Sequence, residues 1–186
     1  HVLIRQHQKE FIGRFAVTLK THFRQQRQHV QYQQKPPGYD EMIQKIQEQW
    51  IDEWLAEFAS DMIATFLVGP AYGWAHIRLC AGQGNSVFLP GPDKVAGASH
   101  PADNSRMDAI LKILDLLKLE VDSKDIKQHW EEYHKRSGHK MPQDYALCYP
   151  SMMIDKLAEK VFETCRGLKL KAFTDQASFS VDLNIP

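Results

Sequence analysis

The chain has 186 residues, 43% of them hydrophobic, which is enough for one substantial core and too little for two. Lys plus Arg and Asp plus Glu number 23 each, a balance that argues against strong attraction of the whole molecule to nucleic acid or to an anionic membrane. The cysteines number three and form no C-x-x-C pair, so we expect a reducing, cytoplasmic compartment without a disulfide framework. No apolar run reaches the roughly 18 residues of a membrane span.

The first helix is predicted over residues 2–34. Apolar or aromatic side chains recur every four residues from Leu3 to Phe23, the spacing that aligns side chains along one helix face. The prolines and glycine of "KPPGYD" end this helix. A second helix is predicted from Asp40 to Val68, where Gly69-Pro70 ends it, and a third over residues 70–81.

These first two helices carry opposite charge. Residues 1–39 hold seven Lys or Arg against one acid, and residues 40–63 hold seven acids against one Lys. We expect the two segments to pack side by side and to neutralise each other, in preference to a nucleic-acid-binding arm. Binding of nucleic acid by the basic first helix is an alternative, and such binding would weaken steeply with added salt.

The rest of the chain predicts a long loop and further helices. Residues 82–99 are rich in glycine and proline without a helical period, and within them residues 86–89, "SVFL", are a candidate edge strand. Amphipathic patterns predict three more helices, over residues 107–121, 125–138 and 151–168, before a poorly ordered tail from about Phe173. The sequence therefore predicts one all-α, multi-helix domain over residues 1–186, with at most one short edge strand.

Two carboxylates stand in the most apolar segment, "EFASDMIATFLVGP" at residues 57–70. Glu57 and Asp61 lie one helical turn apart, on the same stripe as Trp50 and Trp54. A buried carboxylate costs several kcal/mol unless a cation, a metal or hydrogen-bond donors compensate it. The pair therefore predicts either a metal site or a structural ion pair, with Arg78, Arg106 or a buried histidine as the partner.

Two further stretches bear on this choice. The segment "SHPADNSR" has His100 before Pro101 at an expected helix start, with Arg106 in the second turn of that helix. By itself this pattern is typical of an ordinary helix entry with a surface arginine. The other stretch is "HVLIRQH", where His1 leads directly into an apolar helix.

In their order and spacing, His1-Val-Leu-Ile, Glu57-x-x-x-Asp61 and His100-Pro101 with Arg106 resemble the gluzincin zinc metallopeptidases. The nearest branch contains the CaaX-prenyl and HtpX-type proteases. In that family one helix carries H-E-x-x-H, a later helix supplies a glutamate in an E-x-x-x-D frame, and a downstream H-P followed by an arginine completes the site. The resemblance covers roughly residues 1–118 and implies a zincin-like fold that hydrolyses peptide bonds in peptide or protein substrates.

The resemblance also implies a role for each residue. His1 would be the last histidine of H-E-x-x-H and Glu57 a further ligand of Zn²⁺, while Asp61 would accept the second ring N–H of a ligand histidine. His100 would stabilise the oxyanion and Arg106 would hold the carboxylates in place. Such a zinc ion keeps an open position for water, whose pKa falls to about 7, and polarises the scissile carbonyl.

The pattern is incomplete, because no H-E-x-x-H occurs in the 186 residues. The first histidine and the general-base glutamate are expected upstream of His1, so the sequence is interpreted as a fragment lacking an N-terminal part. We expect this chain alone to be inactive. In the intact protein, the loop over residues 82–99 would flank the cleft and gate it.

Other motifs are less informative. In "HWEEYH", His129 and His134 are five residues apart, about 140° around a helix, so they are not expected to bind one metal. Cys80 follows Leu79 in an apolar helix and is interpreted as a core residue. The alternative to an enzyme is a noncatalytic helical regulatory or scaffold protein, in which Glu57 and Asp61 pair with arginines and no metal binds.

Overall fold

The computed structural model describes residues 2–29 and 35–176, and every regular element in these ranges is a helix. The predicted all-α class is therefore confirmed. In chain order the elements are α1 (Val2–His29), α2 (Tyr39–Gln49), η2 (Trp50–Trp54), α3 (Leu55–Val68), α4 (Pro70–Gln83), η3 (Pro92–Lys94), α5 (Asp103–Leu116), α6 (Glu120–Arg136), α7 (Tyr145–Cys148), α8 (Ser151–Gly167) and η4 (Phe173–Asp175).

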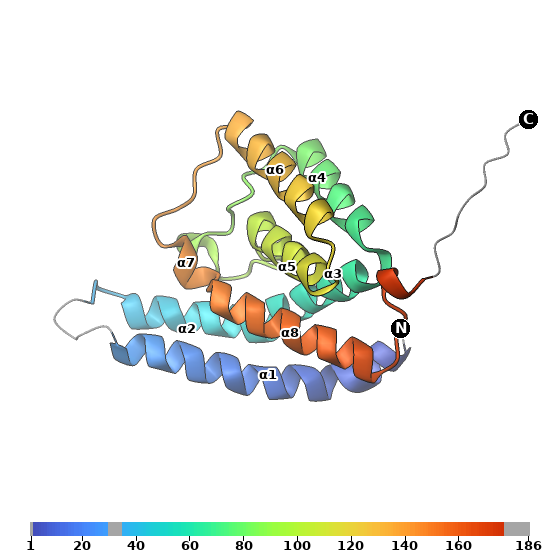
Figure 1. Ribbon diagram of the computed structural model, residues 1–186. Coiled ribbons are helices and arrows are strands. Elements are labelled where there is room, and N and C mark those ends of the chain that lie inside the picture. The colour runs from blue at the N-terminus through green and yellow to red at the C-terminus, as the bar shows by residue number, and fades with distance from the viewer. Residues whose placement is uncertain (1, 30–34, 177–186) are drawn as a thin grey trace, which may run out of the picture.

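Helix α5 occupies the centre of the fold and contacts α3, α4, α6 and α8 (Figure 1). Helices α1 and α2 lie side by side along the opposite edge from α4 and α6, as their opposite charges led us to expect. The buried apolar side chains of the described residues form one continuous cluster. None of the helices in these ranges combines the length and the apolar character needed to cross a bilayer.

The predicted helix over residues 40–68 is uninterrupted, with a wider turn in its middle. Its α-helical ends, α2 and α3, are joined by the π-helical turn η2, which contains Trp50 and Trp54. A π turn holds one more residue than an α turn and so rotates the side chains on one side of it relative to the other. Both tryptophans are fully buried, and their rings meet edge to face with centroids 6.3 Å apart.

The candidate edge strand over residues 86–89 is wrong. The backbone turns here, with the Leu89 N–H donating to the Ser86 carbonyl. Val87 and Phe88 are consecutive and both are buried, whereas successive side chains of an edge strand point to opposite faces. The Val87 carbonyl accepts a hydrogen bond from the Asn104 N–H, which fastens the loop to the start of α5.

The predicted helix over residues 107–121 includes the end of α5 and the start of α6, because its amphipathic pattern continues across the boundary between them. Helix α5 ends at Leu116, and Lys118 adopts a left-handed conformation with φ 64°. The Leu119 N–H then donates to the Leu114 carbonyl, the bond that closes a Schellman motif. No glycine marks this end, so the sequence pattern continues from α5 into α6.

The tail expected from Phe173 begins with an ordered turn. In η4, Asp175 pairs with Arg166 of α8, and the Gln176 side chain donates to the Leu67 carbonyl. Phe173 packs on Gly69, the residue between α3 and α4. The remainder of the predicted tail, residues 177–186, lies outside the described residues.

Gly69 provides a test of this packing. Its φ of 61° and ψ of −141° suit glycine alone, and a Cβ here would lie 2.5 Å from the Phe173 ring. Gly69→Ala should therefore lower the free energy of unfolding by about 2–4 kcal/mol, measured by urea denaturation. The control is Gly82→Ala in α4, where a Cβ meets nothing within 4 Å, so this change should be neutral or stabilising. Equal effects at the two positions would contradict the interpretation.

Candidate functional site

Asp61 lies at the centre of the candidate site and is only 2% exposed. Its carboxylate receives two parallel hydrogen bonds from Arg106 of α5, from Nε to Oδ2 at 2.7 Å and from Nη2 to Oδ1 at 2.8 Å. The Tyr72 hydroxyl of α4 donates a third to Oδ1 at 2.7 Å. Two helices, α4 and α5, thus compensate the buried charge of a third, and α3 can hold an acid in its apolar segment because of them.

This network raises the pKa values of its two donors. Hydrogen bonding to Asp61 raises the pKa of Arg106 despite the opposing effect of its burial. Burial, together with the bond to Asp61, raises the pKa of Tyr72 to about 12. At neutral pH the arginine is therefore charged and the tyrosine keeps the proton that it donates.

Glu57 and His100 form a second pair beside the first. Glu57 lies one turn before Asp61 on α3, and its Oε2 is 3.1 Å from Nδ1 of His100, in the loop that leads into α5. The Glu57 side chain is 35% exposed and that of His100 63%, so this pair faces solvent where the Asp61–Arg106 pair does not. Helix α3 and the segment from His100 to Arg106 thus make two pairs. We call the buried Asp61–Arg106 pair the closed pair and the solvent-exposed Glu57–His100 pair the open pair.

Hydrogen bonds on both sides of His100 fasten its loop to the rest of the fold. Before it, the Ala98 carbonyl accepts from the Trp54 indole at 2.9 Å and from the Gln49 amide at 2.6 Å. After it, the Ala102 N–H donates to the Tyr149 hydroxyl at 3.0 Å. The imidazole position is therefore set by backbone anchors two residues away in each direction.

The two anchors are themselves in contact. The Trp54 and Tyr149 rings stack with centroids 5.0 Å apart and an interplanar angle of 21°. The Tyr149 hydroxyl also donates to the Pro90 carbonyl, so it holds the loop before α5 at a second point. Burial raises the pKa of Tyr149, and this hydroxyl stays protonated.

The structure thus places four of the five predicted site residues together. Glu57, Asp61, His100 and Arg106 meet where α3 packs on the start of α5. Arg106 contacts Asp61 and, at 3.9 Å, Asp103, and its side chain is only 16% exposed, so it is not the surface arginine that the pattern alone suggested. The fifth residue, His1, lies outside the described residues.

A second polar group, which the sequence interpretation missed, lies on the far end of the same network. His76 and Cys80 of α4 and Asp103 of α5 each offer one potential ligand atom, and these atoms lie within 4.8 Å of one another. Cys80 is buried, as predicted, but it lies beside a histidine and a carboxylate instead of in purely apolar surroundings. The signal in the sequence was a His and a Cys at i and i+4 on one helix face.

Burial determines the protonation of this group. It lowers the pKa of His76, against the opposing effect of the Asp103 carboxylate, so the ring is neutral near pH 7. Burial also raises the pKa of the Cys80 thiol to about 12, so a protonated thiol lies beside the neutral imidazole.

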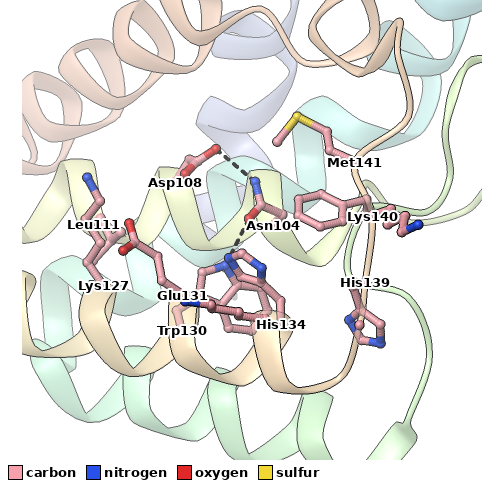
Figure 2. Close-up of a pocket in the computed structure, with 13 residues that line it drawn as sticks. Asn104, Asp108, Leu111, Lys127, Trp130, Glu131, His134, His139, Lys140 and Met141 are labelled. Carbon is pink, nitrogen blue, oxygen red and sulfur yellow. Dashed lines mark hydrogen bonds between the residues drawn. The ribbon is translucent and has the colours of Figure 1, made fainter.

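A separate pocket of about 670 Å³ lies between α5, α6 and residues 138–141 (Figure 2). Asn104 stands at its floor, accepting from the Trp130 indole at 3.0 Å and donating toward Asp108 at 3.5 Å. His134, from the "HWEEYH" segment, also lines the pocket, whereas the His129 ring contacts the Asp125 carbonyl on the exposed side of α6. The two histidines face different surroundings, as their spacing predicts.

The chain was compared with family models, with curated proteins and with solved structures, and none of these matches it.

The closed pair can be tested by removing its negative charge. Asp61→Asn leaves the largely buried Arg106 guanidinium without its counterion, and we expect a loss of about 3–5 kcal/mol in the free energy of unfolding. The control is Glu163→Gln, which breaks an exposed pair with Lys160 and should cost less than about 1 kcal/mol. Urea denaturation measures both, and similar losses would show that the Asp61 pair is not the buried anchor described above.

Asp108 predicts a pH dependence. Enclosure by the pocket walls raises its pKa from 3.8 to about 6, although its surface is open to the solvent in the pocket. The folded chain then binds this proton more tightly than the unfolded chain, so stability falls as pH rises from about 4 to 6. Because of the solvent contact we expect a fall of at most about 1 kcal/mol.

Asp108→Asn should remove this part of the pH dependence, measured by urea denaturation at several pH values. The exposed residue Asp125 on α6 provides the control, since Asp125→Asn should leave the profile as it is. If the free energy of unfolding of Asp108→Asn still fell with pH to the same extent, the Asp108 carboxyl would be as well solvated in the folded chain as in the unfolded chain.

Proposed function

We propose that this chain is the helical core of a gluzincin-like zinc metallopeptidase that hydrolyses peptide bonds in a peptide or protein substrate. The observation that supports it most is the pairing of two separate motifs. The E-x-x-x-D frame of α3 meets the H-P…R segment residue by residue, Glu57 with His100 and Asp61 with Arg106. A single chance contact between two helices would not require both pairs.

The donor chemistry of the described residues fits one part of a zinc site. Asp61 is already neutralised by Arg106, so it is not expected to bind an ion itself. Glu57 contacts an imidazole in place of an arginine and is partly exposed, which suits a ligand carboxylate. In our proposal Glu57 and His1 bind zinc, with the first histidine and the general base supplied by residues that precede this sequence in the intact protein.

Zinc in such a site would make a water molecule more acidic and polarise the scissile carbonyl. The chain's own part is to position groups around that chemistry. With Nδ1 of His100 directed at Glu57, Nε2 is the ring nitrogen that can face a substrate, and in a protonated ring it donates. The anchors at Ala98 and Ala102 hold this ring in place before substrate binds, which favours stabilisation of an oxyanion.

Asp61 would act on a ligand histidine in this proposal. Its Oδ2 accepts one hydrogen bond, from Arg106, and a carboxylate oxygen has room for a second. That position could take the outer N–H of a ligand histidine and fix its tautomer. Arg106 and Tyr72 would then be positioning residues that keep the carboxylate ionised and correctly oriented.

We also propose a cytoplasmic location. Cys80, Cys148 and Cys165 are all buried and none of them forms a disulfide, which suits a reducing compartment.

The alternative function is a noncatalytic helical scaffold. The bidentate Asp61–Arg106 pair favours it, because in a scaffold we expected Glu57 and Asp61 to pair with arginines. Glu57 instead contacts His100. The two functions therefore differ in the role of Glu57, which binds zinc in the metallopeptidase and is a structural residue in the scaffold.

The test uses the extended protein, meaning this chain expressed with whatever precedes His1. Glu57→Ala should lower the zinc content, measured by elemental analysis, by about one zinc per chain, since the peptidase site loses its carboxylate ligand. His100→Ala should keep the zinc and lower turnover of a quenched fluorescent peptide library by about 100-fold or more. The controls are Glu53→Ala on the exposed face of η2 and His129→Ala on α6, which should change neither.

A zinc-free extended protein, or full activity in both Glu57→Ala and His100→Ala, would reject the metallopeptidase in favour of the scaffold. A zinc content that Glu57→Ala leaves unchanged would reject Glu57 as a ligand.

A further inference from the structure

We infer that His76, Cys80 and Asp103 form a second binding site for a thiophilic divalent cation of the Zn²⁺ class, separate from Glu57 and complete within this chain. Nothing in the proposed peptidase chemistry uses these residues. The inference therefore stands whether or not the chain is a peptidase.

The spacing of the three side chains suits such an ion. Cys80 Sγ lies 3.7 Å from His76 Nε2, and His76 Nε2 lies 3.9 Å from Asp103 Oδ1. In a tetrahedral site with zinc–nitrogen and zinc–oxygen bonds of about 2.0–2.2 Å and zinc–sulfur bonds of about 2.3 Å, neighbouring ligand atoms are roughly 3.3–3.7 Å apart. All three ligand atoms lie within 4.8 Å of one another, so closure around an ion requires movements of up to about 1 Å.

Two independent elements build this arrangement. His76 and Cys80 lie one turn apart on α4, so a single helix presents both toward α5. Asp103 is the first residue of α5, and the packing of α4 on α5 brings its carboxylate to them. The His76 and Cys80 residues are 4% and 2% exposed while the Asp103 side chain is 23% exposed, so an ion would enter from the side of the aspartate.

The charges of the surroundings also suit a divalent ion. Asp61, Asp103 and Arg106 together carry a net charge of −1, and a Cys80 thiolate would bring it to −2, which a divalent cation neutralises. The neutral form of His76 is the one that binds metals.

Binding involves two proton movements. The Cys80 thiol loses its proton to solvent as the metal–sulfur bond forms. His76 Nε2 lies 3.2 Å from the Asp103 carbonyl, so a proton on Nε2 must move to Nδ1 before that nitrogen can bind an ion. One proton is released in total, and no oxidation or reduction takes place.

The preference for a soft ion follows from the ligand set. A thiolate, an imidazole and a single carboxylate favour zinc and cobalt over magnesium and calcium, which bind mainly oxygen. Trp130 covers the imidazole with ring centroids 5.7 Å apart, and the Tyr133 hydroxyl donates to the Cys80 carbonyl. These contacts hold the two α4 ligands in place from the side of α6.

The experiment is a titration of the 186-residue chain with Co²⁺, followed by absorption spectroscopy. We expect one Co²⁺ per chain, with a near-ultraviolet sulfur-to-cobalt charge-transfer band and visible bands of a tetrahedral ion, and displacement by Zn²⁺. Cys80→Ser should abolish the charge-transfer band. Cys165→Ser, which removes another buried thiol, should leave it intact.

Glu57→Ala in the same chain separates this inference from the proposed function. It should leave the Co²⁺ spectrum unchanged, whereas it should remove zinc from the peptidase site of the extended protein. Should Cys80→Ser fail to fold by circular dichroism, Asp103→Asn serves in its place, and it should weaken Co²⁺ binding at least tenfold. No charge-transfer band in the unmodified chain, or a band that survives Cys80→Ser, would overturn the inference.

Discussion

The need to neutralise one carboxylate deep in the core organises this molecule. Asp61 lies on the most apolar helix, and no residue of that helix compensates it, so the donors come from α4 and α5. If α5 moved away, the energy lost would be that of a buried, unpaired charge, which exceeds the value of most single apolar contacts, and loss of α4 would remove one further hydrogen bond. The hydrogen-bond geometry around Asp61, together with the burial of apolar side chains, therefore specifies how α3, α4 and α5 pack.

The same arrangement leaves one pair open next to the closed one. Because α5 is held in register by Arg106, the loop before it must bring His100 to the level of Glu57, one turn earlier on α3. Backbone anchors at Ala98 and Ala102 then remove the freedom that an exposed loop would otherwise have. A rigid closed pair supporting an accessible open pair is the usual relation between a structural shell and a reactive site.

Much of the fold follows from local sequence patterns, and the exceptions have local causes. Helical periodicity predicts most of the helices, but it cannot show the end of α5, because Lys118 takes a left-handed conformation that glycine usually marks. The resemblance implied that Glu57, Asp61, His100 and Arg106 would share one site, with Arg106 holding the carboxylates, but it did not imply the Glu57–His100 pair. The group around Cys80 escaped notice because its members are unremarkable one by one, and only the packing of α4 on α5 brings Asp103 to them.

The contacts that build the site also join residues far apart along the chain. The bonds from Arg106 to Asp61 span 45 positions, and that from Trp54 to Ala98 spans 44. At a synthesis rate of about 5–20 residues per second, roughly 2–9 seconds separate the emergence of α3 from a ribosome and the arrival of its partners. During that interval the apolar helix is exposed with its acid unpaired, so the nascent chain presents its most aggregation-prone face before the core can close over it.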